Sequence, residues 1–227
     1  MPGKFIVIEG TDGSGKTEQF KRLTERLEQS GQKVARFDFP QYGKPSAFFA
    51  ESYLNGKFGT AEAVGPYRAS LFYALDRYEA SFALRAALEE GSIAVSNRYV
   101  GSNLAHQGGK FQTSEERKKF FEWDYEVEYE MLKIPKPDVS IVLHVPAEVA
   151  QELVGKKTER AYLHGKTHDI HEADLAHLKR AEEVYLEIVK LFPADFRLIK
   201  CVENGKLLPI EAIHEKVWKM VSGELGI

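Results

Sequence analysis

A glycine-rich stretch, Gly10-Thr11-Asp12-Gly13-Ser14-Gly15-Lys16-Thr17, lies near the start of the chain. Its spacing is that of the phosphate-binding loop, G-x-x-x-x-G-K-[ST]. In such a loop the glycines let backbone N–H groups point inward, the lysine reaches the outer phosphates, and the threonine hydroxyl can bind Mg²⁺ at a helix N-terminus. We therefore expect residues 10–17 to hold a nucleoside triphosphate.

The residues around this loop supply the structural context that it needs. The apolar run Phe5-Ile6-Val7-Ile8 predicts a buried parallel strand before the loop. Phe20, Leu23 and Leu27 have helical spacing after it, and Ser30-Gly31 ends that helix. A strand, a glycine loop and a helix in this order favour a nucleotide site over a glycine-rich surface turn.

The rest of the chain continues to alternate strands with helices. We expect further strands at 33–39, 93–96, 139–145 and 196–200, and helices at 46–54, 66–89, from about 102, at 115–132, up to about 191 and from 209. This alternation predicts an α/β protein with a five-stranded parallel sheet and helices on both faces, the three-layer P-loop fold, in a single domain over 1–227. Ligands are expected at the carboxyl ends of the strands.

The composition argues against several classes of protein. The 227 residues include 31 Lys and Arg against 34 Asp and Glu, a formal net charge of -3, so neither nucleic acid nor a membrane is an expected partner. Cys201 is the one cysteine, and its apolar neighbours favour a buried thiol. The sequence contains no signal-peptide pattern and no apolar run of membrane-spanning length, so we expect a cytoplasmic protein.

Two residues of the expected helix at 66–89 suit a flat heterocycle. Tyr73 and Arg77 are four residues apart and therefore share a helix face. An aromatic ring and a guanidinium together fit a base that carries carbonyl oxygens. A packed tyrosine beside a surface arginine is the alternative that these two residues leave open.

Arg98 follows the expected strand at 93–96, where its guanidinium can hold a phosphate through two N–H groups. Beyond it, four polar residues fall on one helix face by three-and-four spacing: Ser102, Asn103, His106 and Gln107. Asn103 can both donate and accept and so can recognise a base edge. His106 taken alone fits a surface histidine equally well.

A basic segment at about 155–169 contains Lys156, Lys157, Arg160 and Lys166. A run of charges is usually a solvated surface, but a long polar connection is also typical of an active-site lid. These residues alone leave both interpretations open.

Together, these pieces resemble the thymidylate kinase family, and the resemblance runs through nearly all of the chain. The phosphate loop by itself indicates only a nucleotide, whereas the spaced set is specific to this family. The matching pieces are Glu9 with the loop 10–17, Phe39-Pro40, residues 71–79 around Asp76-Arg77, Asn97-Arg98-Tyr99-Val100-Gly101-Ser102-Asn103, Pro135-Lys136-Pro137-Asp138 and Asp169-Ile170-His171-Glu172.

The resemblance implies roles around the acceptor dTMP. Phe39 would line the thymine pocket, Tyr73 would stack on the base, and Arg77 would bond a base carbonyl. Ser102 and Asn103 would lie at the base edge, with His106 beside the deoxyribose, where its bulk disfavours a 2′-hydroxyl. Arg98 would hold the acceptor phosphate, and His171 would join the dTMP-binding residues.

The resemblance also implies ATP as co-substrate, Mg²⁺ and a homodimer. Asp12 would serve the sugar 3′-hydroxyl or the Mg²⁺ shell, with Thr17 and Glu172 as further metal ligands. Family members with an arginine in the phosphate loop differ from those whose lid supplies the positive charge. Gly13 makes this chain resemble the second type, which adds Lys156 and Lys157 to the ATP site and Arg160 to the catalytic groups Lys16, Asp12 and Arg98.

Two positions depart from the family pattern. The family usually has aspartate where this chain has Asn97, so one negative charge near the metal is expected to be missing. It also tends to carry an arginine just after Phe39-Pro40, where this chain has Gln41-Tyr42. Both departures leave room for a divergent specificity.

These observations predict a nucleoside monophosphate kinase that transfers the γ-phosphoryl group of ATP to dTMP, giving dTDP. No general base is required, because the acceptor phosphate is already an anion at neutral pH. The alternatives are a kinase for another nucleoside, deoxynucleoside or monophosphate and, more remotely, a P-loop GTP-binding switch. The switch is disfavoured because the sequence lacks the Asn-Lys-x-Asp guanine motif.

Overall fold

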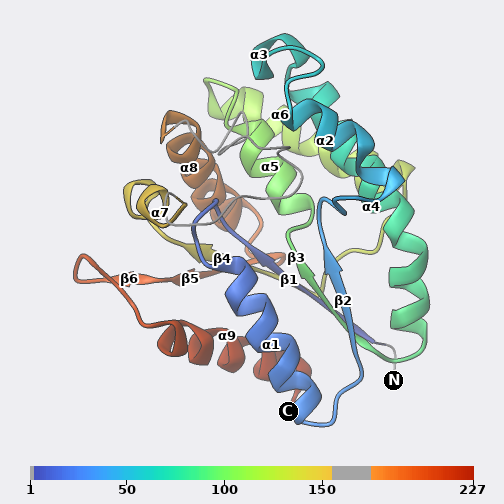
Figure 1. Ribbon diagram of the computed structural model, residues 1–227, viewed down its shortest axis with the longest axis vertical. Helices are drawn as coiled ribbons and strands as arrows, with labels where there is room; N and C mark the ends of the chain where they lie inside the picture. Colours follow the sequence, from blue (N-terminus) through green and yellow to red (C-terminus); the bar gives the residue numbers. More distant parts are fainter. Residues whose placement is uncertain (1–2, 155–174) are drawn as a thin grey trace.

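The central sheet consists of five parallel strands, as expected, and their spatial order is β2-β3-β1-β4-β5 (Figure 1). The structure is a computed structural model and describes residues 3–154 and 175–227. Its strands are β1 Lys4–Glu9, β2 Val34–Asp38, β3 Ile93–Asn97, β4 Val139–His144 and β5 Phe196–Lys200. β1 lies between β3 and β4, so its carboxyl end opens at the middle of the sheet edge.

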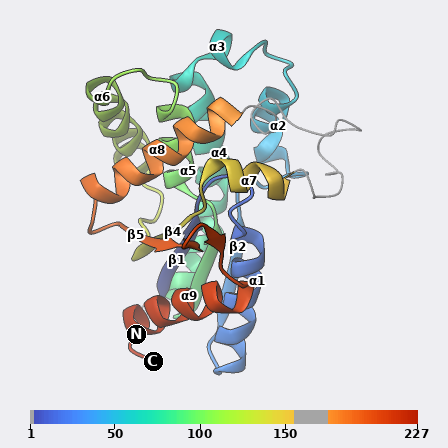
Figure 2. The same cartoon turned by 90° about the vertical axis from the view of Figure 1, so that its left-hand side faces the viewer.

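Helices cover both faces of this sheet (Figures 1 and 2). The helices of the described residues are α1 Lys16–Gln29, α2 Phe48–Leu54, α3 Ala61–Val64, α4 Pro66–Glu89, α5 Val100–Gly108, α6 Ser114–Tyr125, α7 Ala147–Val154, α8 Leu175–Leu191 and α9 Ile210–Leu225. A 3₁₀ turn, Pro45–Ala47, precedes α2. The helices at 66–89 and from 209 match the expectation closely.

The alternation of side chains along β1 explains the two layers. Phe5 and Val7 belong to the core beneath α4, α5, α6 and α8. Ile6 and Ile8 belong to the core beneath α1 and α9. All four are buried, as a central parallel strand requires.

The structure differs from the sequence-based expectation in four places. The expected helix at 115–132 ends at Tyr125, and residues Glu126–Met131 continue it as a π-helical segment with wider turns. A short hairpin, β6 Val202–Glu203 and β7 Lys206–Leu207, follows β5. The helices α3 and α7 were not predicted either, because each is short and lies beside polar sequence.

Two expectations about the whole chain can be compared with the structure. Cys201 is a fully buried free thiol, and burial raises its pKa to about 12. Among the helices that the structure describes, none is both long and apolar enough to cross a membrane.

Candidate active site

A cavity of about 450 Å³ opens at the carboxyl ends of β1, β2 and β3. This volume lies in the range of small-molecule sites. Most of the site residues predicted from the sequence line it: Asp12, Gly13, Gly15, Lys16, Thr17, Phe39, Tyr73, Arg77, Arg98, Ser102, Asn103, His106 and Gln107. Gly10, Thr11 and Ser14 are buried within the same loop. Lys156, Lys157, Arg160, Lys166, His171 and Glu172 lie outside the described residues.

The phosphate loop connects β1 directly to α1. The Lys16 ammonium curls back over the loop and donates to the Thr11 carbonyl oxygen at 2.8 Å. Gly13 has φ +84, and a Cβ there would lie 2.2 Å from the backbone oxygen of Ala150 in α7. A side chain at Gly13 therefore collides with α7, which explains in packing terms why this loop carries no arginine.

Glu9, the last residue of β1, fixes the start of α5. It is fully buried and accepts hydrogen bonds from the backbone N–H groups of Tyr99 at 2.8 Å and Ser102 at 3.1 Å. The Ser102 hydroxyl donates to the same carboxylate at 2.7 Å, and the Tyr185 hydroxyl at 2.9 Å. Glu9 thereby bonds two backbone N–H groups at the start of α5 and fixes the chain beside Arg98.

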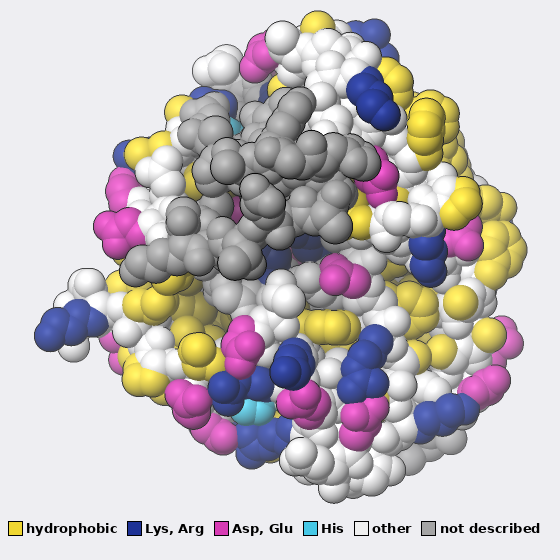
Figure 3. All heavy atoms as spheres, viewed as in Figure 1, with side chains coloured by type: hydrophobic (Ala, Val, Ile, Leu, Met, Phe, Trp, Pro, Cys, Tyr) yellow, Lys and Arg dark blue, Asp and Glu magenta, His cyan; other side chains and the backbone are white. Residues whose placement is uncertain are grey.

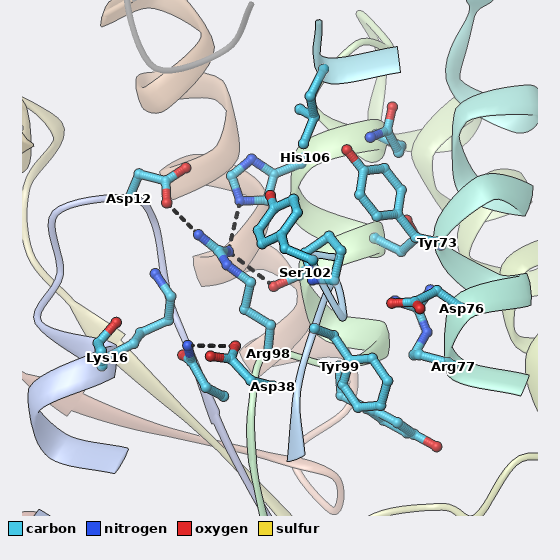
Figure 4. A pocket seen from close by; sticks show the side chains of 18 of the residues that line it. Asp12, Lys16, Asp38, Tyr73, Asp76, Arg77, Arg98, Tyr99, Ser102 and His106 are labelled. Carbon is cyan, nitrogen blue, oxygen red and sulfur yellow. Dashed lines mark hydrogen bonds and ion pairs between the residues drawn. The ribbon is translucent and has the colours of Figure 1, made fainter. Parts of the chain in front are cut away.

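Arg98 occupies the centre of the cavity. Its backbone has φ 67, which is uncommon for a residue with a side chain. The guanidinium pairs with Asp12 and donates to Ser102 Oγ at 3.1 Å and His106 Nε2 at 3.3 Å (Figure 4). Burial is the largest single influence and opposes the charge, but Asp12, Tyr185, Glu9 and Tyr42 together outweigh it, so the pKa of Arg98 is raised. The arginine is therefore permanently cationic and faces a space where an anion can replace Asp12.

His106 is held in one tautomer by its two neighbours. Arginine has no acceptor, so Arg98 donates to His106 Nε2, and the proton of the neutral ring lies on Nδ1. That Nδ1 is 3.1 Å from Nε2 of His177, a buried residue of α8, and the two rings stack at 5.3 Å. This contact fixes the plane of the His106 ring beside Arg98.

Asp38 provides a carboxylate that sequence reasoning missed. It ends β2 directly opposite Asn97 of β3, and Asn97 Nδ2 donates to its Oδ1 at 2.9 Å. Burial raises the pKa of Asp38 although Asn97, Arg98 and Lys16 oppose that shift. The neighbouring strand thus places a carboxylate beside Asn97, the position where the family resemblance leads us to expect one negative charge fewer. An acidic residue at the end of a parallel strand was the available signal.

The opposite end of the cavity contains Arg77 and Asn103. Arg77 Nε donates to both carboxylate oxygens of Glu128, at 3.1 and 3.0 Å, and Nη2 donates to Oε1. Arg77 is 3% exposed and Glu128 is fully buried, so this ion pair is sealed from water. Glu128 lies in the π-helical segment, four residues after Asp124. The sequence interpretation placed both on a charged helix and missed their inward direction.

Aromatic rings and an ordered turn complete this end. Tyr73 and the buried Phe39 line the cavity, and the Phe39 ring lies 5.6 Å from Tyr99. Gln41, at the position of a family departure, donates through its backbone N–H to Asp76 Oδ2 at 2.8 Å. Its side chain donates to Asp76 and to Glu79, so it bonds to α4. Tyr42, the other departing residue, lines the cavity.

Within residues 3–154 and 175–227, no group of three or more His, Cys, Asp or Glu side chains could by itself hold a metal ion. Thr17, Asp12 and Asp38 all line the cavity and carry side-chain oxygen atoms that can ligate a metal. Asn97 Oδ1 is buried without a hydrogen-bond partner among the described residues. Such a sparse oxygen set suits Mg²⁺, which takes one or two carboxylates and completes its shell with phosphates and water.

Comparison with known proteins places this site in a family. The thymidylate kinase family model matches residues 8–217. A thymidylate kinase of Mycobacterium tuberculosis is 31% identical over 185 residues, covering 81% of this chain and 85% of that protein. A probable thymidylate kinase of Pyrococcus abyssi is 27% identical over 227 residues, covering 99% of this chain and 98% of that protein.

A solved structure shows the same fold. The thymidylate kinase of Candida albicans superposes with a TM-score of 0.74 at 20% identity, covering 98% of this chain and 92% of that one. The phosphate loop, the arginine at the end of β3 and the polar face of α5 all fall within the matched residues 8–217. This chain belongs to the thymidylate kinase family.

Proposed function

We propose that the cavity holds the two substrates of the family reaction end to end, with the phosphates of ATP on the loop and dTMP between Arg98 and Arg77. The reaction is the ATP-dependent phosphorylation of dTMP to dTDP. One observation carries the residue assignment: a single cavity is lined by Lys16, Thr17, Arg98, Arg77 and Asn103. Within it, Arg98 lies between Lys16 and Arg77 (Figure 4).

At the phosphate end, Arg98 holds the acceptor phosphate and Lys16 holds the outer phosphates of ATP. Arg98 exchanges its contact with Asp12 for phosphate oxygens, which its planar fork matches. Asp12 is then released toward the sugar 3′-hydroxyl or the metal. Phosphoryl transfer needs alignment and neutralised charge, which these cations and the loop N–H groups supply.

At the other end, Tyr73 and Phe39 enclose the base while Arg77 and Asn103 bond its edge. His106 lies between the base end and Arg98, where its ring fills the space beside the deoxyribose. His106→Gly should therefore raise the activity on the ribonucleotide relative to dTMP. An unchanged ratio between these two monophosphates would remove His106 from the sugar site.

The metal assignment follows the oxygen donors that line the loop. Thr17, Asp12 and Asp38 would hold Mg²⁺ together with phosphate oxygens and water, and the ion would neutralise phosphate charge. The roles of Lys156, Lys157 and Arg160 as charge donors, of His171 at dTMP and of Glu172 at the metal stay predictions from the sequence, as does a cytoplasmic location.

We also propose that two copies pair through α4 and α2. Four exposed residues form one row along α4 at spacings of four, three and four: Leu71, Leu75, Tyr78 and Phe82. Phe48 and Phe49 of α2 are exposed as well. Figure 3 shows hydrophobic side chains gathered along the right-hand edge, over these helices. A continuous apolar surface of this kind is typical of an interface between subunits.

Sedimentation tests this pairing. Wild type should sediment at twice the mass of one chain, and Phe82→Glu combined with Leu75→Glu should sediment at the mass of one. A wild type that stays monomeric at tens of micromolar contradicts the proposed interface.

The assignment of the acceptor is tested by a product assay with ATP. Wild type should convert dTMP to dTDP and leave thymidine unphosphorylated, because Arg98 has no phosphate to bind on a nucleoside. Arg98→Lys should raise KM for dTMP more than KM for ATP. Efficient phosphorylation of thymidine would instead favour a deoxynucleoside kinase.

A further inference from the structure

Two buried carboxyl groups lie behind the base end of the cavity, and the proposed reaction does not use them. Asp124 is the penultimate residue of α6, and Glu128 lies four residues later in the π-helical segment. Both side chains are fully buried. Burial, and next the nearby Glu128 carboxylate, raise the pKa of Asp124 well above its usual range. Glu128 accepts hydrogen bonds from both Arg77 and Asn103, so it joins these two residues of the cavity wall.

Glu128 determines which N–H groups of Arg77 remain for a ligand. The Nε and Nη2 atoms donate to Glu128. Nη1 makes no hydrogen bond with the described residues. Because Arg77 lines the cavity and has no acceptor of its own, it can offer a base nothing but a hydrogen-bond donor.

The same cluster fixes the amide of Asn103. Its Nδ2 donates to Glu128 Oε1 at 3.2 Å and to Asp124 Oδ1 at 3.3 Å. The Ser70 backbone oxygen accepts from the same Nδ2 at 3.2 Å. Turning the amide by 180° would set its oxygen against the Ser70 carbonyl oxygen and the Glu128 carboxylate, which is strongly unfavourable in a buried site. Asn103 Oδ1 is thus left to accept a hydrogen bond from the cavity side.

We propose that Glu128 is a positioning residue for base selection: it presents Arg77 as a donor beside Asn103 as an acceptor. A 4-oxo base with a protonated N3, such as thymine or uracil, has the complementary edge, because its O4 accepts and its N3–H donates. Cytosine has the reverse pattern, with an amino donor at position 4 and an unprotonated N3 acceptor. With cytosine, the Arg77 donor would then face the amino donor at position 4, and the Asn103 acceptor would face the N3 acceptor. This inference rests on the base site proposed above.

The first measurement uses the wild-type enzyme alone. A site that bonds polar groups of its substrate rejects an analogue with reversed polarity by roughly 10³-fold or more in kcat/KM. We expect this preference for dTMP over dCMP. dUMP should also be preferred over dCMP, because uracil differs from thymine only in the methyl group and has the same hydrogen-bonding edge. A dTMP preference over dCMP below tenfold would overturn the proposal without any variant.

The second measurement is Glu128→Gln, with Glu130→Gln as its control. Glutamine keeps the shape and can still accept from Arg77, but its new N–H₂ group faces Asn103 Nδ2 and favours the turned amide. The dTMP preference over dCMP should fall by at least tenfold, while KM for ATP stays unchanged. Glu130 lies exposed in the same segment, so Glu130→Gln should leave the preference unchanged.

Two further variants separate a positioning role from a structural one. Glu128→Asp retains an acceptor-only group and should keep more of the preference than Glu128→Gln. If both variants lose activity on dTMP and dCMP equally, Glu128 merely supports the fold and the inference is wrong. Asn103→Ala tests the base site itself: an unchanged KM for dTMP would show that the proposed base site is misplaced, which is a different failure.

Discussion

The groups that line the two ends of the cavity differ in their burial and in their hydrogen-bond partners. At the proposed phosphate end, the cavity is lined by residues of the loop 10–17 and by side chains such as Thr17 and Asp38. At the base end it is lined by Arg77 and Asn103, which are almost fully buried and bonded to the buried acids Asp124 and Glu128.

This difference separates catalysis from stability. A charged group that faces water can be removed without leaving an unsatisfied partner, so its loss should affect chemistry more than folding. Removing a charged group that is sealed inside the protein leaves its partner charge uncompensated, so this loss should affect both chemistry and folding. The phosphate end should therefore tolerate substitution in stability measurements, and the base end should not.

The largest expected effect is on the stability of the base end. Glu128→Ala leaves the Arg77 guanidinium buried without its counter-charge and should cost about 3–5 kcal/mol in the free energy of unfolding. Urea unfolding followed by circular dichroism measures this cost. Glu28→Ala removes a partner of similar geometry from the exposed Arg36 and should produce no resolvable change. Equal effects in the two variants would show that water reaches Arg77.

At the phosphate end, we expect Arg98→Ala to affect catalysis more than stability. Loss of a two-pronged phosphate contact should lower kcat/KM for dTMP by roughly 10²-fold, about 3 kcal/mol of transition-state binding. The unfolding midpoint in urea should fall less than in Glu128→Ala, because Asp12 is 16% exposed, whereas the Arg77 partner that Glu128→Ala leaves behind is 3% exposed. A value of kcat/KM within a few-fold of wild type would remove Arg98 from the acceptor site.

The sequence specifies the fold through local patterns. The apolar strands at 4–9 and 139–144 and the helix Pro66–Glu89 are marked by runs of buried residues and by glycine or proline at their ends. The phosphate loop and Arg98 are likewise local features. The short helix α7 escaped prediction because its eight residues lie between a strand and polar sequence.

The base end could be predicted only in part, because its pairs are distant in sequence. Arg77 and Glu128 are 51 residues apart, and nothing near either one indicates the other. Asp124 and Glu128 have the spacing of one helix face, and in the structure this face packs against Asn103 and Arg77, which no residue near either acid indicates. Asp38 and Asn97 meet through strand register, which the sequence alone does not determine.

The packing of the phosphate loop sharpens the comparison, since here the fixed element is backbone. Gly13→Ala should destabilise the protein by about 2 kcal/mol more than Gly43→Ala, because its Cβ would overlap the Ala150 oxygen. Gly43 has nearly the same φ, +83, but no atom lies within 4 Å of its added Cβ, so it reports the backbone strain alone. Equal unfolding free energies would mean that α7 moves away from the loop at little cost.

The smallest effect is expected for Asp38→Asn, and its sign depends on pH. The pKa of Asp38 is raised in the folded protein, so below the unfolded pKa both states are protonated and the substitution should change nothing. As pH rises, the unfolded chain ionises first, and the folded state loses stability until its own pKa is passed. Asparagine removes that cost, so the variant should melt slightly higher than wild type at pH 7 and equally at pH 3. Screening by the solvent in the cavity keeps the gain under about 1 kcal/mol, or up to about 3 °C.

The same variant should bind Mn²⁺ more weakly in the presence of ATP, measured by electron paramagnetic resonance. A variant that melts lower at pH 7 than wild type, with unchanged Mn²⁺ binding, would show that Asp38 serves the β2–β3 contact instead of the phosphate end.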